Sequence, residues 1–168
     1  MTLFYLDASA FVKRFVPENG TEVVDSLFSF RHATDTFATS LLGVLEVKAT
    51  LHRLRRGGRL KEEVMGGLLA SLLRDLGGFR FLAPVGRATL DRAMSITETH
   101  ALRAGDTIHL ATILEIMGAR TANEDGLMVL SSDKELLAAC ERERLAVINP
   151  EDADALGRLQ TLRSRPNS

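Results

Sequence analysis

The chain of 168 residues is predicted to form one α/β domain, with a parallel sheet of about five strands covered by helices on both faces. Three observations support this fold class. Short apolar segments with β-prone residues alternate with longer segments of helical periodicity. The strand-like segments are almost continuously apolar, as expected for strands buried on both faces. Hydrophobic residues make up 45% and charged residues 26% of the chain, which suits a folded globular domain.

The first three elements follow from apolar patterning and one proline. Residues 3–6 form a short apolar run that we predict as a buried strand ending at Asp7. Residues 8–16 are predicted to be helical and to end before Pro17, because proline cannot continue a helix. Residues 18–30 carry apolar side chains at helical spacing and are predicted as a second helix.

The middle of the chain repeats this alternation of strand and helix. Residues 34–39 are rich in threonine and phenylalanine, which favours a strand. Ser40 is the predicted N-cap of a helix over residues 41–55, which ends before Gly57. A further helix is predicted over residues 60–76.

The second half has the same organisation, with β-prone runs between helical segments. The predicted strands are 79–82, 127–130 and 145–148. The predicted helices are 87–102, 104–117 and a segment capped by residues 131–133 that extends through Cys140. Residues 151–168 begin as a helix and end in a polar tail. We therefore divide the chain into a domain of residues 1–150 and a C-terminal extension of residues 151–168.

Composition narrows the function classes. The net charge of −1 argues against a protein that coats nucleic acid electrostatically. Cys140 is the single cysteine, which excludes an intrachain disulfide and fits a reducing compartment. No apolar run approaches the roughly 18 residues that span a bilayer, and the first residues lack the features of a signal peptide. We expect a cytoplasmic protein without a membrane segment.

Four acidic residues stand where catalytic side chains are expected in such a sheet. Asp7 ends the first strand and Asp133 follows a later strand, so both lie near the carboxyl ends of strands, where working sites form. Glu46 and Asp106 lie within helices beside apolar neighbours, where an unpaired charge is costly to bury. The alternative for Glu46 is an outward position on an amphipathic helix.

Four carboxylates in one site repel one another and raise their own pKa values. A divalent cation relieves this repulsion, and ligands that are all oxygen favour Mg²⁺ or Mn²⁺. Such an ion activates water for attack on phosphorus, so phosphodiester hydrolysis is the predicted reaction. Asp7 is the expected central bridging ligand.

These acids and their neighbours resemble the PIN-domain ribonucleases, and most closely the VapC-type toxins of type II toxin–antitoxin pairs. The matching segments, in the order and spacing of that family, are residues 5–10, 46, 102–111 and 130–136. The resemblance covers about residues 3 to 150. The departures are Gly105, where other residues are common, and the surplus after Pro150.

The resemblance implies a three-layer α/β/α sandwich and a metal site built from Asp7, Glu46, Asp106 and Asp133. It also implies RNA cleavage that leaves a 5′-phosphate, a protein antitoxin that blocks the site, and a homodimer. The resemblance also implies that the residue at the position of His109 recurs in the family, in addition to the four acids.

Three polar residues beside the acids are expected to support them. Ser9 can hydrogen-bond Asp7 or cap the following helix, and Ser132 precedes Asp133. His109 lies three residues after Asp106, so the two can share a helix face. We expect His109 to pack or to support an acid, with direct metal ligation as the alternative.

Basic residues near the acids are candidates for contact with RNA phosphates, or are solvated cations at a helix end. They are Lys13, Arg14, Arg53 and Arg56. Glu124 and Asp125 are interpreted as turn residues rather than ligands.

Two alternatives to a ribonuclease stay open. One is a catalytically silent PIN-like module that binds a protein partner, although all four acids are present. The other is a different metal-dependent phosphoesterase, such as a phosphatase with an aspartate nucleophile. That chemistry favours a second acid two residues after Asp7, where this chain has Ser9.

Overall fold

The computed structural model describes residues 2–29, 35–119 and 126–164. Glu124 and Asp125, which we interpreted as turn residues, lie outside the described residues. Within the described residues, no helix is both long enough and apolar enough to cross a bilayer.

Within the described residues, the strands form one parallel sheet, in the order β3-β2-β1-β4-β5. The strands are β1 (Leu3–Leu6), β2 (Thr36–Ser40), β3 (Phe81–Ala83), β4 (Leu127–Leu130) and β5 (Ala146–Ile148). The central strand β1 is buried along its whole length and pairs with β2 on one side and β4 on the other. The prediction of a parallel sheet of about five strands is therefore confirmed.

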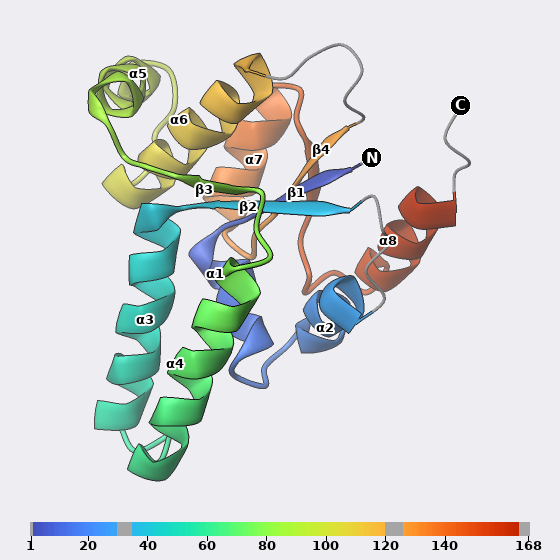
Figure 1. Cartoon of the computed structure of the whole chain (residues 1–168). Helices are drawn as coiled ribbons and strands as arrows, with labels where there is room; N and C mark the ends of the chain where they lie inside the picture. Colours follow the sequence, from blue (N-terminus) through green and yellow to red (C-terminus); the bar gives the residue numbers. More distant parts are fainter. Residues whose placement is uncertain (1, 30–34, 120–125, 165–168) are drawn as a thin grey trace.

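Helices cover the two faces of the sheet (Figure 1). They are α1 (Ala8–Phe11), the 3₁₀ turn η1 (Val12–Arg14), α2 (Thr21–Ser29), α3 (Leu41–Arg56), α4 (Glu62–Leu76), α5 (Arg87–Thr97), α6 (Ala104–Gly118), α7 (Lys134–Arg142) and α8 (Ala155–Ser164). Phe4 and Leu6 of β1 join a core with residues of α1 to α4 and α8. Leu3 and Tyr5 point the other way and join a core with residues of α5, α6 and α7. The fold is thus a three-layer α/β/α sandwich.

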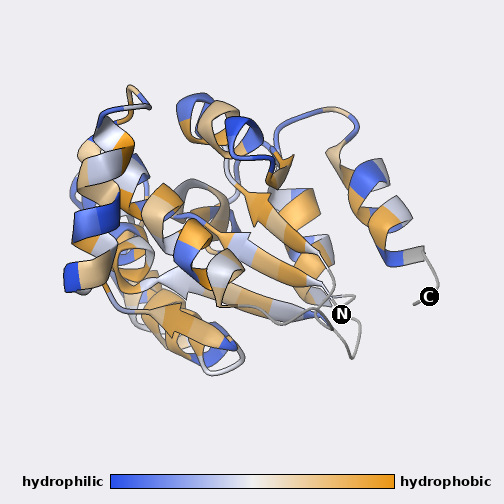
Figure 2. Cartoon of the chain, turned by 90° about the horizontal axis from the view of Figure 1, so that it is seen from above, coloured by the Kyte–Doolittle hydropathy of each residue, from blue (hydrophilic) through white to orange (hydrophobic). Residues whose placement is uncertain are grey.

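The apolar residues of the strands lie between these two helical layers (Figure 2). Most helices place their polar residues away from the sheet, as an amphipathic covering layer must. The exposed apolar exceptions include Leu45 on α3 and Met94 on α5.

Two predicted helices end well before their predicted last residues. The segment 8–16 continues after α1 only as the 3₁₀ turn η1, because the carbonyl oxygen of Val12 accepts bonds from both Phe15 and Val16 ahead of Pro17. The segment 87–102 ends at Thr97. The residues that follow form a turn before α6.

The C-terminal segment packs against the rest of the domain. Ala155 and Leu159 of α8 are fully buried in the core that also contains Phe4. Arg163, which we expected in a polar tail, donates hydrogen bonds to Asp35 at 2.8 Å and to the carbonyl oxygens of Ser26 and Leu27. The division of the chain at residue 150 stays a prediction.

Candidate functional site

A pocket of about 560 Å³ opens at the carboxyl ends of the central strands. Three helices start at this edge with a side-chain cap that follows a strand. Asp7 caps α1, Ser40 caps α3 and Asp133 caps α7. Each cap bonds N–H groups within three residues, and the three capping segments lie far apart in the chain. The fold brings them together at this edge of the sheet. All four predicted acids line the pocket: Asp7, Glu46, Asp106 and Asp133.

Asp7 is held in place by hydrogen bonds and is only 4% exposed. The hydroxyl of Ser9 donates to its carboxylate, with both oxygens 2.9 Å away. The hydroxyl of Ser131 donates to Oδ2 at 2.8 Å, and the backbone N–H of Ala10 donates to Oδ1 at 2.9 Å. Burial raises the pKa of Asp7, an effect that these bonds and the nearby His109 only partly offset.

The supporting serines form a connected group. The Ser9 hydroxyl accepts a bond from the backbone N–H of Ser132 at 2.7 Å, and the Ser131 hydroxyl accepts one from the N–H of Asp133 at 2.9 Å. Ser132 therefore reaches Asp7 through its backbone and Ser9. The side chain that contacts Asp7 directly from this loop is that of Ser131, which we did not select from the sequence.

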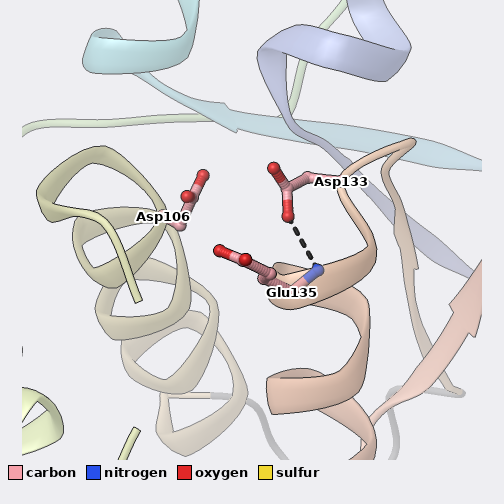
Figure 3. Close-up of side chains that lie close together, drawn as sticks. All are labelled: Asp106, Asp133 and Glu135. Atoms are coloured by element: carbon pink, nitrogen blue, oxygen red, sulfur yellow. Dashed lines mark hydrogen bonds between the residues drawn. The ribbon is translucent and has the colours of Figure 1, made fainter. Parts of the chain in front are cut away.

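Asp106, Asp133 and Glu135 point toward one another across α6 and the start of α7 (Figure 3). One oxygen from each lies within 4.8 Å of the others. Burial and the nearby Asp133 carboxylate raise the pKa of Asp106 to about 6. Asp133 also accepts hydrogen bonds from the backbone N–H groups of Glu135 and Leu136 at 2.8 and 3.0 Å.

Sequence analysis missed Glu135, because an acid in the first turn of a helix is ordinarily explained by the helix dipole. The sequence feature that could have identified Glu135 is its position two residues after the capping Asp133. Asp7 and Glu46 line the pocket with Asp106 and Asp133 but are not part of this closest group of the described acids, whereas Glu135 belongs to the group but lies outside the pocket lining.

Glu46 faces the pocket rather than solvent alone. Its Oε2 lies 2.9 Å from Nε2 of His109, and Nδ1 of His109 lies 2.7 Å from the hydroxyl of Tyr5. Burial raises the pKa of Tyr5 well above its ordinary value, so the phenol keeps its proton and is able to donate a hydrogen bond to Nδ1. With Nδ1 as an acceptor, Nε2 carries a ring proton and donates to Glu46. In this structure His109 thus contacts the carboxylate of Glu46, one of the four predicted acids.

Two glycines allow α3 and α6 to approach this closely. A Cβ at Gly105 would lie 3.1 Å from Oε1 of Glu46. A Cβ at Gly43 would lie 2.8 Å from Oγ1 of Thr39 and 3.1 Å from Cε1 of His109. Gly105, which we noted as a departure from the family pattern, therefore leaves room for the Glu46 carboxylate.

The four candidate RNA-contacting cations lie in different surroundings. Lys13 lines the pocket, but it is 3% exposed and its ammonium group pairs with Glu18 at 3.2 Å and Glu151 at 2.8 Å. Arg14 points away from the pocket lining, toward Asp25 and Asp75.

Arg53 and Arg56 lie near the end of α3, and both are exposed. Arg53 lines the pocket and bonds the hydroxyl of Thr50 at 3.2 Å, whereas Arg56 lies outside the pocket lining. Arg103, which we did not select from the sequence, also lines the pocket. Its position three residues before Asp106 was the available signal.

The donor set of the pocket fits a hard divalent cation. Its acids supply oxygen ligands only, and the pKa of Asp106 is raised by burial and, to a lesser extent, by the neighbouring carboxylates. The surrounding hydrogen bonds fix Asp7 and Glu46 as ligand-supporting contacts do in metal sites. The arrangement suits hydrolysis of a phosphodiester at a metal centre.

Known proteins resemble the chain in sequence and in fold. The chain matches no family model. It is 34% identical over 139 residues to ribonuclease VapC45 of Mycobacterium tuberculosis (strain CDC 1551 / Oshkosh) and equally to ribonuclease VapC49 of M. tuberculosis (strain ATCC 25618 / H37Rv). Each alignment covers 81% of this chain and 88% of the relative.

Solved structures share the fold at lower sequence identity. PAE2754 from Pyrobaculum aerophilum matches with a TM-score of 0.62 and 22% identity, covering 95% of this chain and 96% of that one. VapC20 from M. tuberculosis, a toxin that cleaves the sarcin–ricin loop, matches with a TM-score of 0.58 and 15% identity over 81% and 94% of the chains. A toxin–antitoxin complex from Klebsiella pneumoniae matches with a TM-score of 0.55 and 15% identity over 89% and 98% of the chains.

The two mycobacterial relatives share enough of their length and sequence with this chain to define its family, and the acid-lined pocket lies in the part of the fold where the chain's own motifs predicted it. The protein belongs to the VapC family of PIN-domain ribonucleases.

Proposed function

We propose that this protein is the toxin of a toxin–antitoxin pair and cuts RNA internally by metal-dependent hydrolysis in the acid-lined pocket. One observation carries the proposal. The four predicted acids come from segments spread over more than a hundred residues of the chain and line a single pocket, where burial and the neighbouring carboxylates raise the pKa of Asp106 to about 6. Such crowding of carboxylates is unfavourable for folding, so a functional role is its best explanation.

The proposed cofactor is Mg²⁺ or Mn²⁺. Asp106, Asp133 and Glu135 are the closest group of ligand atoms, and Asp7 and Glu46 complete the acidic wall. When bound, the cation supplies an activated water and neutralises charge on the leaving oxygen. The new bond joins the water oxygen to phosphorus and the P–O3′ bond breaks, which leaves a 5′-phosphate and a 3′-hydroxyl.

The protein's own residues hold the acids in position for this reaction. Ser9 and Ser131 restrict the Asp7 carboxylate to one orientation, and the bond from His109 does the same for Glu46. We therefore propose that Ser9, Ser131 and His109 act by orienting the acids, and that Ser132 contributes through its backbone N–H.

The proposed partners are RNA as substrate, a cognate protein antitoxin and a second copy of the chain. The Klebsiella pneumoniae complex of similar fold supports the antitoxin. Apolar side chains exposed at helical spacing support partner surfaces, since large exposed apolar groups often mark interfaces: Leu41 and Leu45 on α3, and Leu90 and Met94 on α5. We place the activity in the cytoplasm, where RNA is available and Cys140 stays reduced.

The test is cleavage of a structured RNA by the purified chain with Mn²⁺, Mg²⁺ or EDTA. We expect metal-dependent internal cuts that Asp7→Asn abolishes. The matched control is Asp91→Asn, which alters an exposed aspartate of α5 outside the pocket lining and should cut RNA as the parent does.

If the parent cuts no RNA, two added assays separate the alternatives: binding of a protein partner and release of phosphate from small phosphate esters. A silent binding module would cut no RNA under any condition but would still bind a protein partner. A different phosphoesterase would leave RNA intact and release phosphate from small phosphate esters in a reaction that requires Mn²⁺.

A further inference from the structure

Among the described residues, the pocket lining contains six carboxylates but only three cationic side chains, Lys13, Arg53 and Arg103. An RNA strand that enters such a site meets net repulsion, because each nucleotide carries a negative phosphate. The protein as a whole, with a net charge of −1, does not compensate for this repulsion. The proposed divalent cation offsets part of this repulsion, and cationic side chains in the pocket wall are the other local source of attraction.

Lys13 is not available for this role. Its side chain is 3% exposed, and its ammonium group is paired with Glu18 and Glu151. The pKa of Glu151 is lowered mainly by the hydrogen bond from Lys13. Contact with a phosphate would require breaking a pair that is already formed.

The two arginines are in the opposite situation. Both are exposed side chains of the pocket lining. The guanidinium group of Arg103 forms no hydrogen bond or ion pair with any described residue, and among these residues that of Arg53 donates only to the neutral hydroxyl of Thr50. Each guanidinium group can therefore offer paired N–H donors to a phosphate without giving up a carboxylate partner.

Each arginine lies near one of the acids. Arg103 is close to Asp106 at the start of α6, and Arg53 is farther along α3 than Glu46. Arg103 precedes Asp106 by three residues at the start of α6, which is less than one helical turn. Arg53 follows Glu46 by seven residues on α3, or about 10 Å along the helix axis. The arginines therefore line the pocket from the same two helical segments that supply Glu46 and Asp106.

We propose that Arg53 and Arg103 bind the phosphates that flank the cleaved bond and so position the RNA strand across the pocket. This inference rests on the proposed ribonuclease function and adds Arg103 to it as a residue that holds the substrate. Contacts of this kind fix the register of the strand without reading its bases.

The first test measures binding in the Asp7→Asn background, which keeps the RNA intact. Fluorescence anisotropy of a short fluorescein-labelled single-stranded RNA gives the affinity over a range of salt concentrations in the presence of Mn²⁺. Each of Arg53→Gln and Arg103→Gln should reduce the slope of log affinity against log salt by about 0.7, or about fivefold over a tenfold range of salt. Arg103→Lys should restore most of the slope, because it restores the charge.

The matched control is Arg56→Gln, which removes an exposed arginine of the same helix outside the pocket lining. Its slope should equal that of the parent. Equal losses for Arg56→Gln and Arg53→Gln, or no loss for Arg53→Gln and Arg103→Gln, would overturn the inference.

The second test measures cleavage with Asp7 restored. The Arg53→Gln and Arg103→Gln variants should raise KM for RNA while kcat and Mn²⁺ affinity stay near the parent values. A parent protein that cuts RNA, together with arginine variants that behave like the parent, would refute the inference alone. A parent that cuts no RNA but binds it through both arginines would refute the nuclease function and leave only the RNA-binding role of the two arginines.

Discussion

Replacement of Asp106 by asparagine should make the metal-free protein more stable at neutral pH. The pKa of this carboxyl is raised to about 6 by burial and by the neighbouring Asp133. A raised pKa means that the folded state binds the proton more tightly than the unfolded chain does. The stability that protonated Asp106 contributes is therefore present below pH 3.8 and is lost as the pH rises through about 6. Asparagine cannot ionise, so the variant avoids this loss.

The size of the effect follows from the shift in pKa. A rise from 3.8 to about 6 corresponds to about 3 kcal/mol for a group shielded from water. Asp106 is partly exposed, so screening by solvent reduces the gain to about 1 kcal/mol. For a domain of this size, 1 kcal/mol raises Tm by about 3 °C.

The assay is thermal unfolding in EDTA between pH 5 and pH 7, followed by the same scan at pH 7 with Mn²⁺. Tm of the parent protein should rise as the pH falls, and the rise should be smaller in Asp106→Asn. Part of the dependence will persist, because burial also raises the pKa of Asp7. Mn²⁺ should raise Tm of the parent but not that of Asp106→Asn.

The control is Asp91→Asn, which changes an exposed aspartate paired with Arg87 and should shift Tm by little. A lower Tm for metal-free Asp106→Asn at pH 7 would refute the reasoning, because it would mean that the ionised carboxylate stabilises the fold.

Three further substitutions test the supporting contacts. Gly105→Ala should leave Tm unchanged or slightly higher, because alanine favours helix. The added methyl group should displace Glu46 and weaken Mn²⁺ binding about tenfold. Unchanged Mn²⁺ binding in a calorimetric titration would contradict this. Tyr5→Phe removes the donor to Nδ1 of His109, so nitrogen NMR should show a changed ring tautomer, and an unaltered spectrum would disprove the proposed direction of the bond. Arg163→Ala should lower Tm by about 10 °C, because a buried ion pair costs about 3 kcal/mol to break; a loss below about 2 °C would mean that α8 docks without it.

The parts of the fold and site that sequence analysis predicted are those with local causes. Ser40 and the segment 131–133 were predicted to cap helices, and Ser40 and Asp133 cap α3 and α7 through bonds to N–H groups within three residues. Asp7 was predicted only as the end of a strand, and in the structure it, rather than Ser9, caps α1. Because cap chemistry acts over so short a range, it can be identified from the sequence alone. The apolar strands were predictable for a similar reason, since burial on both faces removes polar residues from them.

The parts that could not be predicted depend on contacts between distant segments. The pairing of Lys13 with Glu151 joins residues 138 positions apart, and it converts a candidate RNA contact into an internal ion pair. The bond between Tyr5 and His109 spans 104 positions. No periodicity or motif indicates which side chains meet across such separations.

Glu135 was overlooked for a different reason. Its sequence position fits both a helix N-terminus and a metal site, and only the approach of α6 to α7 distinguishes them. The fold places Asp106 of α6 next to Glu135, although α6 and α7 are separate segments of the sequence. This proximity cannot be identified from the residues around Glu135 alone.

The central claim is that the carboxylate pocket binds the divalent cation that drives RNA cleavage. The most direct test follows both properties in one titration, with Mn²⁺ occupancy measured by electron paramagnetic resonance and single-turnover RNA cleavage measured in the same samples. The account predicts that occupancy and cleavage rise together with one midpoint, and that Asp106→Asn shifts both to higher Mn²⁺. Cleavage that persists in EDTA, or a pocket that fills with Mn²⁺ while RNA stays intact, would contradict it.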